Sequence, residues 1–123
     1  MKKFILSIAC VSFLLVSFTT KENKKLSPKF QTSIEKGKRL FKKNACTGCH
    51  QEQMKVVGPS LKDIAAKYTS KKANLTTFLQ GKSEAIVDTA PSQVAMMKAS
   101  LSITKRMKAE DLKAITDYIL SIK

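Results

Sequence analysis

The sequence predicts a small all-α domain of four or five short helices. Apolar residues recur every three or four positions in several segments, whereas no segment alternates with period two, as a half-buried strand would. The chain has 123 residues, of which 43% are hydrophobic and 26% charged, with only 4 Gly and 3 Pro. This composition excludes collagen-like, low-complexity and wholly disordered chains, and the length allows one domain.

The N-terminus has the pattern of a secretory signal peptide over residues 1–20. Lys2 and Lys3 precede an apolar run over residues 4–18, which is interrupted only by serines and followed by small residues. A membrane-spanning helix needs about 18 apolar residues, so this run is short for a permanent anchor. An uncleaved anchor is the alternative. Cys10 lies inside the run and would leave with it.

A polar stretch follows over residues 21–31. It contains Pro28 and shows no periodicity, so it is expected to be a flexible tether to a domain over residues 32–123. The whole chain carries a net charge of +14. Loss of the two leader lysines lowers this to 14 minus 2, or +12. Such a surplus predicts that partner surfaces are acidic.

The first helix is expected from Ser33 to Lys43. Thr32 and Glu35 have the Thr-x-x-Glu spacing of a capping box. The residues that follow with helical spacing are Ile34, Gly37, Leu40 and Phe41. Because Gly is unfavourable inside a helix, its place on the apolar side favours a helix that crosses closely there, with a merely tolerated Gly as the alternative.

Two further helices are expected in the middle of the chain. Pro59 suits the first position of one, in which Leu61, Ile64, Ala65 and Tyr68 recur on one face. Ser70 is a candidate cap for the next, which contains Leu75, Phe78 and Leu79. Gly81 would end it, since Gly adopts the left-handed conformation found just past a helix C-terminus.

The last helix presents one apolar face, formed by Leu112, Ile115, Ile119 and Ile122. Met107 and Leu112 are placed as a hydrophobic staple around its start, and Asp111 lies in its first turn. Lys108 is a poor N-cap, so the first residue of this helix is less well defined by the sequence.

The segment Cys46-Thr47-Gly48-Cys49-His50 has the C-x-x-C-H pattern of covalent haem c attachment. Two thiols bind the haem vinyl groups through thioethers, and the adjacent His is the proximal ligand of the iron. A structural zinc site needs four ligands, and only three Cys or His residues remain after the leader. A thioredoxin-like pair needs a βαβ setting that the sequence lacks. His50 is also the only histidine, so a bis-His haem within one chain is excluded.

From Ile34 to Lys123 the sequence resembles the small class I bacterial cytochromes c. The matching segments are Gly-Lys-Arg-Leu-Phe at 37–41, the haem motif at 46–50, Met-Lys-Val-Val-Gly-Pro-Ser-Leu at 54–61, Lys-Asp-Ile-Ala-Ala-Lys-Tyr at 62–68 and Ala-Ile-Thr-Asp-Tyr-Ile-Leu at 114–120. The resemblance implies the class I cytochrome c fold, with the first and last helices crossing at Gly37, Phe41 and Tyr118. It also implies that the carbonyl of Pro59 accepts a hydrogen bond from His50, which raises the basicity of the ligand.

Family members usually supply a Met as the sixth iron ligand from a loop before the last helix. Met54 lies too close to His50 to reach the opposite side of the haem, and Met107 is already placed as a staple. Met97 is therefore the first candidate, Met96 the second and Met107 the third, and an iron without a Met ligand is the remaining alternative. Met96 and Met97 lie in a segment over 82–106 that lacks the family's Met-Pro pair. A core role is the alternative, since helical spacing is shared by Val94, Met97 and Leu101.

The resemblance implies a one-electron carrier with haem c as its cofactor. The signal-peptide pattern predicts that it is periplasmic, and a monomer is expected. Neither a second haem motif nor an acid–base pair suggests an enzyme. Dispersed lysines favour redox proteins with acidic docking surfaces over nucleic acid. Two alternatives remain open: a five-coordinate haem protein that binds NO or CO, and a tethered cytochrome subunit of a respiratory complex.

Overall fold

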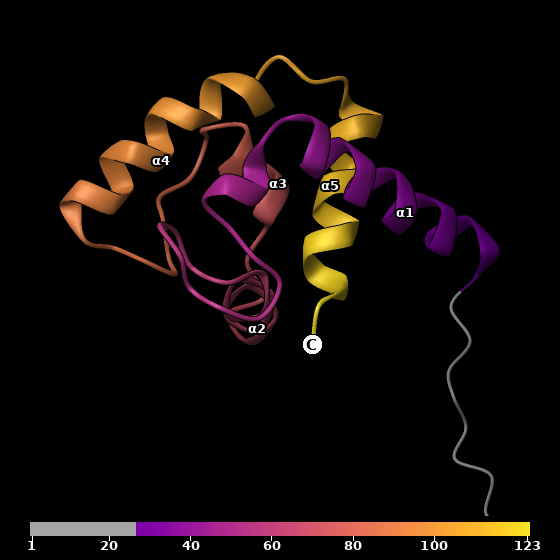
Figure 1. Ribbon diagram of the computed structural model, residues 1–123, viewed down its shortest axis with the longest axis horizontal. Helices are drawn as coiled ribbons and strands as arrows, with labels where there is room; N and C mark the ends of the chain where they lie inside the picture. The colour runs from indigo at the N-terminus through magenta and orange to yellow at the C-terminus, as the bar shows by residue number, and fades with distance from the viewer. Residues whose placement is uncertain (1–26) are drawn as a thin grey trace, which may run out of the picture.

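The computed structural model describes residues 27–123, and within this range the chain is all-α, as predicted. Its helices are α1 (Pro28–Lys43), the 3-10 helix η1 (Cys46–Gly48), α2 (Leu61–Ser70), α3 (Leu75–Leu79), α4 (Pro91–Thr104) and α5 (Ala109–Ser121) (Figure 1). None of the described helices combines the length and apolar character needed to cross a membrane. The expected signal peptide over 1–20 lies outside the described residues.

Helices α1 and α5 cross in direct contact, as the resemblance implied (Figure 1). A Cβ added at Gly37 would collide with the carbonyl oxygen of Ala114 and would lie 2.8 Å from Cβ of Tyr118. One turn along, the rings of Phe41 and Tyr118 meet edge to face, with centroids 5.5 Å apart. Gly37 therefore lets the two helix backbones approach, and the aromatic pair fills the space beside them.

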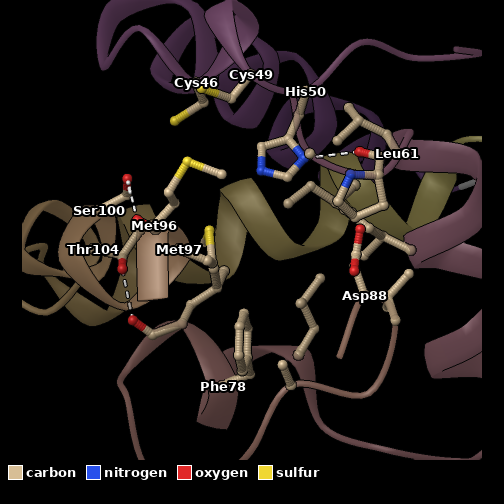
Figure 2. Close-up of a pocket in the computed structure, with 18 of the residues that line it drawn as sticks. Cys46, Cys49, His50, Leu61, Phe78, Asp88, Met96, Met97, Ser100 and Thr104 are labelled. Carbon is tan, nitrogen blue, oxygen red and sulfur yellow. Dashed lines mark hydrogen bonds between the residues drawn. The ribbon is translucent and has the colours of Figure 1, made fainter. Parts of the chain in front are cut away.

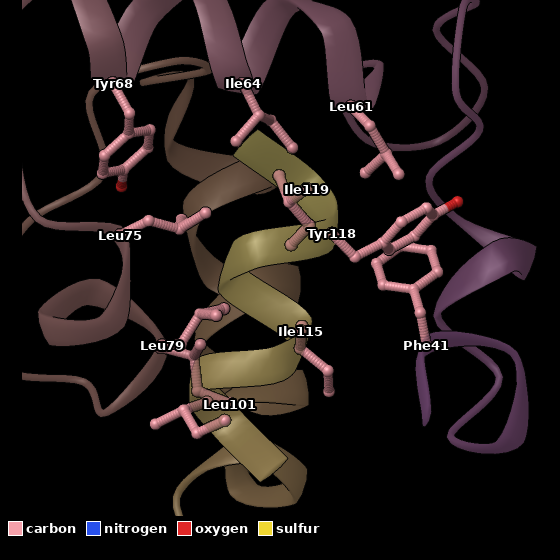
Figure 3. Packing of buried hydrophobic residues seen from close by; sticks show 11 residues of the cluster. Phe41, Leu61, Ile64, Tyr68, Leu75, Leu79, Leu101, Ile115, Tyr118 and Ile119 are labelled. Atoms are coloured by element: carbon pink, nitrogen blue, oxygen red, sulfur yellow. The ribbon is translucent and has the colours of Figure 1, made fainter. Parts of the chain in front are cut away.

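Helix α5 is the centre of the hydrophobic core (Figure 3). Its buried apolar side chains include Leu112, Ile115 and Ile119. They face buried residues of α2 and α3, namely Leu61, Ile64, Tyr68, Leu75 and Leu79. Met107 packs against the edge of this cluster, in keeping with the expected staple at the start of α5.

The start of α1 differs from the prediction. The helix begins at Pro28, so residues 28–31 of the expected tether are helical and the capping box does not form. Pro28 fits the first turn because its fixed φ is already helical and its missing N–H has no partner to lose there. The Thr32 hydroxyl donates to the carbonyl of Pro28 at 3.0 Å, one turn back inside the helix.

The caps of α2 and α3 also differ by a few residues. Helix α2 begins at Leu61 and not at the predicted Pro59. Its N-cap is Ser60, whose hydroxyl accepts a hydrogen bond from the Asp63 N–H at 3.0 Å. Ser70 is the last residue of α2, and the cap of α3 is Asn74. Gly81 does adopt the predicted left-handed conformation, with φ of +71°.

Helix α4 occupies the segment that family members usually form as a loop, and it agrees with the helical spacing of Val94, Met97 and Leu101. Pro91 opens it, and the preceding turn is held where the Ala90 N–H donates to Oδ1 of Asp88 at 3.3 Å. At its other end, the buried hydroxyl of Thr104 donates to the carbonyl of Leu79 at 2.6 Å. Figure 1 shows α4 on the far side of the molecule from most of α1. Between these two ends, α4 makes few direct contacts with other helices.

Candidate haem-binding site

The C-x-x-C-H segment forms a tight turn directly after α1. Ala45 adopts a left-handed conformation with φ of 56°, which reverses the chain at the helix end. The N–H groups of Cys49 and His50 then donate to the carbonyl of Cys46 at 3.2 Å and 3.0 Å. This turn places both thiols and the imidazole beside one cavity (Figure 2). Both thiols are free.

His50 makes the hydrogen bond that the resemblance implied. Its Nδ1 lies 2.8 Å from the carbonyl oxygen of Pro59. Because a carbonyl can only accept, Nδ1 carries the proton and donates, which leaves Nε2 with a free lone pair for a metal. The imidazole is held in the orientation drawn in Figure 2.

Gly58 makes room for that imidazole. A Cβ at this position would lie 2.9 Å from Nδ1 of His50 and closer still to its Cε1. The Gly58 N–H also donates to the carbonyl of Cys49 at 2.9 Å, which ties the loop back to the haem motif. Sequence reasoning assigned Gly58 no role of its own, although its place before Pro59 in a Gly-Pro pair was a usable signal.

The cavity itself has a volume of about 480 Å³ and is predominantly apolar. Its walls come from the end of α1, from η1 and the His50 loop, from α2 and α3, from residues 85–88, from α4 and from the inner face of α5. Met96 and Met97 extend into it from α4 (Figure 2). Neither Met54 nor Met107 lines it: Met54 is 60% exposed and Met107 packs against the core near α5.

The electrostatics of the cavity suit a large, mostly apolar group. Burial raises the pKa of the Cys46 thiol and raises the pKa of Tyr68 to about 12, so both groups are neutral near pH 7. Among residues 27–123, Asp88 is the only carboxylate that lines the cavity. A hydrogen bond from Lys55 and the backbone N–H of Ala90 lower the pKa of Asp88. Its charge is therefore already balanced.

The donor set fits haem c. Two free thiols two residues apart, an oriented imidazole and a large apolar cavity are brought together, and these are the groups that covalent haem attachment needs. Within residues 27–123 no three or more His, Cys, Asp or Glu side chains form a group that could hold a metal ion. The zinc alternative therefore has no ligand set in this part of the chain.

Comparison with known proteins gives the same assignment. Residues 34–123 match the family described as cytochrome c. The chain belongs to this family. It is 42% identical over 84 residues to cytochrome c-552 of Nitrosomonas europaea, a match that covers 68% of this chain and 76% of that protein. It is 58% identical over 31 residues to cytochrome c-551 of Ectopseudomonas mendocina, covering 25% of this chain and 38% of that relative.

A solved structure is also similar to this cytochrome c. The crystal structure of wild-type Nitrosomonas europaea cytochrome c552 aligns with 70% of this chain and 99% of its own, at 39% identity and a TM-score of 0.47. As a member of the cytochrome c family, the chain is an electron-transfer protein rather than an enzyme and carries covalent haem c. Cys46 and Cys49 would hold the haem and His50 would ligate its iron, which supplies one-electron redox chemistry.

Proposed function

We propose that this cytochrome c is a periplasmic one-electron carrier between respiratory redox proteins, with His50 and Met97 as the iron ligands in its resting state. The observation that carries the proposal is the arrangement around one cavity. Cys46, Cys49 and the Nε2 side of His50 lie beside it, and the two methionines of α4 enter it. A His and Met ligand pair raises the reduction potential, as suits a carrier that accepts electrons.

Met97 is favoured over Met96 by its surroundings. Met97 is partly buried and packs against the core cluster, whereas Met96 is 48% exposed. A partly buried thioether loses less freedom on binding than an exposed one, because its rotamers are already restricted. Met107 is not a candidate on this geometry, since it does not line the cavity.

The partners are proposed to be redox proteins with acidic docking surfaces. Lys42 and Lys43 end α1, are exposed, and immediately precede two cavity-lining residues, Asn44 and Ala45. They form no ion pair in the described part of the chain. Their charge would raise the rate of encounter with an acidic partner and make it fall with added salt.

An ionic-strength experiment tests this docking idea. Lys42→Gln should slow electron transfer to the acceptor at low salt and flatten its salt dependence. Lys29→Gln is the matched control: it removes the same charge from the opposite end of α1, about 20 Å away at 1.5 Å per residue. Equal effects of the two variants, or a rate independent of salt, would contradict a docking surface at the cavity rim.

The location is tested by the mature N-terminus. Export and cleavage predict that the mature chain begins near Thr20, which intact-mass measurement of the purified holoprotein can check. A chain that retains residues 1–20 would instead support the tethered subunit of a respiratory complex. The signal-peptide pattern, with Lys2 and Lys3 before a 15-residue apolar run, supports the first outcome.

Optical spectra of the mature protein test the carrier function. Covalent low-spin haem with the sulfur-to-iron charge-transfer band in the ferric form, and a ferrous form that resists CO, is the expected result. A high-spin spectrum that shifts with CO would support the five-coordinate protein that binds NO or CO. Absence of covalent haem would contradict the assignment of Cys46 and Cys49.

A further inference from the structure

Helix α4 presents two adjacent methionines to the same cavity, and this deepens the function proposed above, on which it rests. Consecutive residues of a helix point about 100° apart, so two neighbours enter one cavity only if it covers a wide arc of the helix. The α4 residues that line the cavity are Gln93, Val94, Met96, Met97, Ala99, Ser100, Ile103 and Thr104. They cover more than half of the helix circumference.

Neither methionine lies at the middle of that arc. At about 100° per residue, the middle falls close to Ser100, with Met96 and Met97 about 50° to either side. The orientation of α4 therefore brings both sulfurs to the cavity and favours neither of them. Figure 2 shows the two side chains entering the same space from one turn of the helix.

The attachment of α4 allows either sulfur to be used. The turn before the helix is tied by Asp88, which pairs with Lys55 at 2.8 Å, and its last turn by the Thr104 hydroxyl on the Leu79 carbonyl. Between these points the helix makes few direct contacts with other helices. A Met side chain has three rotatable bonds, so a roll of the helix about its axis, together with a rotamer change, can exchange the two thioethers.

We propose that Met96 is a second axial ligand that exchanges with Met97. In the exchange one iron–sulfur bond breaks and the equivalent bond to the neighbouring sulfur forms, so no electron or proton is transferred. His50 remains in place because the Pro59 carbonyl holds it from the other side. The packing of Met97 against the core sets it as the resting ligand, and Met96 is the more solvent-exposed alternative.

Leucine variants of the holoprotein test the exchange. Leu keeps the volume of Met but cannot bind iron. If either sulfur can bind, Met96→Leu and Met97→Leu should each retain the ferric charge-transfer band, because the remaining Met is then the ligand. The double variant should lose it. Loss of the band in Met97→Leu alone, with Met96→Leu like the wild type, would overturn the proposal. Met54→Leu is the control, since Met54 does not line the cavity and its variant should match the wild type.

A measurement on the unmodified side chains completes the test. In the reduced protein labelled with methyl-carbon-13 methionine, the ligand methyl signal is strongly shifted by the haem ring. Exchange predicts a wild-type shift that changes with temperature and lies between those of the two Leu variants. A wild-type shift identical to that of Met96→Leu at every temperature would overturn exchange. A wild-type protein with haem but no shifted Met methyl would instead contradict the proposed carrier function.

Discussion

The α1–α5 crossing and the α4 side of the molecule are built in different ways. At the crossing, Gly37 lets one helix backbone touch another, and Phe41 and Tyr118 pack directly together. On the α4 side, a cavity of about 480 Å³ separates much of the helix from the rest of the protein. The crossing is stabilised by protein atoms alone, whereas haem bound in the cavity would complete the packing of α4.

This difference is visible in the two helices themselves. The buried residues of α5 lie on one face, as expected for a helix that is covered by other helices of the same chain. Helix α4 contains one charged residue in 14, and its apolar residues are spread around it. Hydrophobic periodicity reports where other parts of the chain cover a helix, and it weakens where a prosthetic group does so.

The largest effect is expected from a methyl group at the crossing. Gly37→Ala should lower the free energy of unfolding by about 3 kcal/mol, because the new Cβ must displace backbone atoms of α5. Gly48→Ala is the control, since a Cβ there meets nothing within 4 Å, and should change it by about 0.5 kcal/mol or less. Chemical denaturation of both holoproteins measures the difference. Similar losses in the two would refute close packing at Gly37.

A hydroxyl deletion probes the attachment of α4. Thr104→Val should destabilise the protein by about 2 kcal/mol, because the buried carbonyl of Leu79 loses the hydrogen bond from the Thr104 hydroxyl. Thr69→Val, at an exposed position of α2, should cost about 0.5 kcal/mol or less. Thermal unfolding followed by circular dichroism distinguishes them. A neutral Thr104→Val would mean that α4 is held by other contacts.

Hydrogen exchange compares the two regions within one molecule. Amides in the middle of α4 should exchange about tenfold faster than those in the middle of α5, equivalent to about 1.4 kcal/mol less protection. The reason is that α4 can open without disrupting the crossing. Native-state exchange of the reduced holoprotein, followed by NMR, gives both rates. Equal protection would show that the cavity side and the crossing unfold as one unit.

The smallest effect concerns a polar contact at the edge of the crossing. The Tyr118 hydroxyl donates to Oε1 of Glu52 at 2.9 Å, and Lys38 donates to the same oxygen at 3.0 Å. Tyr118→Phe should therefore lower the free energy of unfolding by about 1 kcal/mol at neutral pH. The hydrogen bonds from Lys38 and Tyr118 also lower the pKa of Glu52, so its contribution is present near neutrality and is lost in acid.

The same variant should change the alkaline stability profile. Burial and the Glu52 carboxylate raise the pKa of Tyr118 from 10.0 to about 12. The protonated side chain thus contributes stability that is complete below pH 10 and is lost as the pH rises through about 12. Denaturation at several pH values should show a shallower decline in Tyr118→Phe, and the remaining decline includes contributions from Tyr68 and Lys36, whose pKa values are also raised. Identical slopes would contradict this assignment.

Much of the fold could be predicted because its information is local. The face of α5, the staple at Met107 and the crossing at Gly37 follow from apolar spacing or from the family resemblance. The errors lie at helix ends, where several residues can cap. The N-cap of α3 is Asn74 and not the predicted Ser70, because the conformation of the whole turn between α2 and α3 decides which side chain reaches a free N–H of the helix. Pro28 likewise started α1 earlier than the capping pattern indicated.

The site divides in the same way. Cys46, Cys49 and His50 are contiguous, so the chemistry of the motif is readable from the chain. Pro59 was reached through the family resemblance, and the structure places its carbonyl on His50. The choice between Met96 and Met97 stays a prediction, since it depends on how α4 is oriented across the cavity. Sequence spacing cannot supply that orientation when the helix has no single apolar face.

The acceptor on His50 has a consequence for how the protein tolerates mutation. It is a main-chain carbonyl, so no replacement of the Pro59 side chain deletes the acceptor atom. The position sensitive to substitution is the preceding one, because any side chain larger than that of Gly58 would collide with the imidazole of His50. A substitution at position 59 can therefore change the basicity of His50 only by moving the loop that carries the carbonyl. Substitutions at position 58 should therefore change the reduction potential of the haem iron more often than substitutions at position 59.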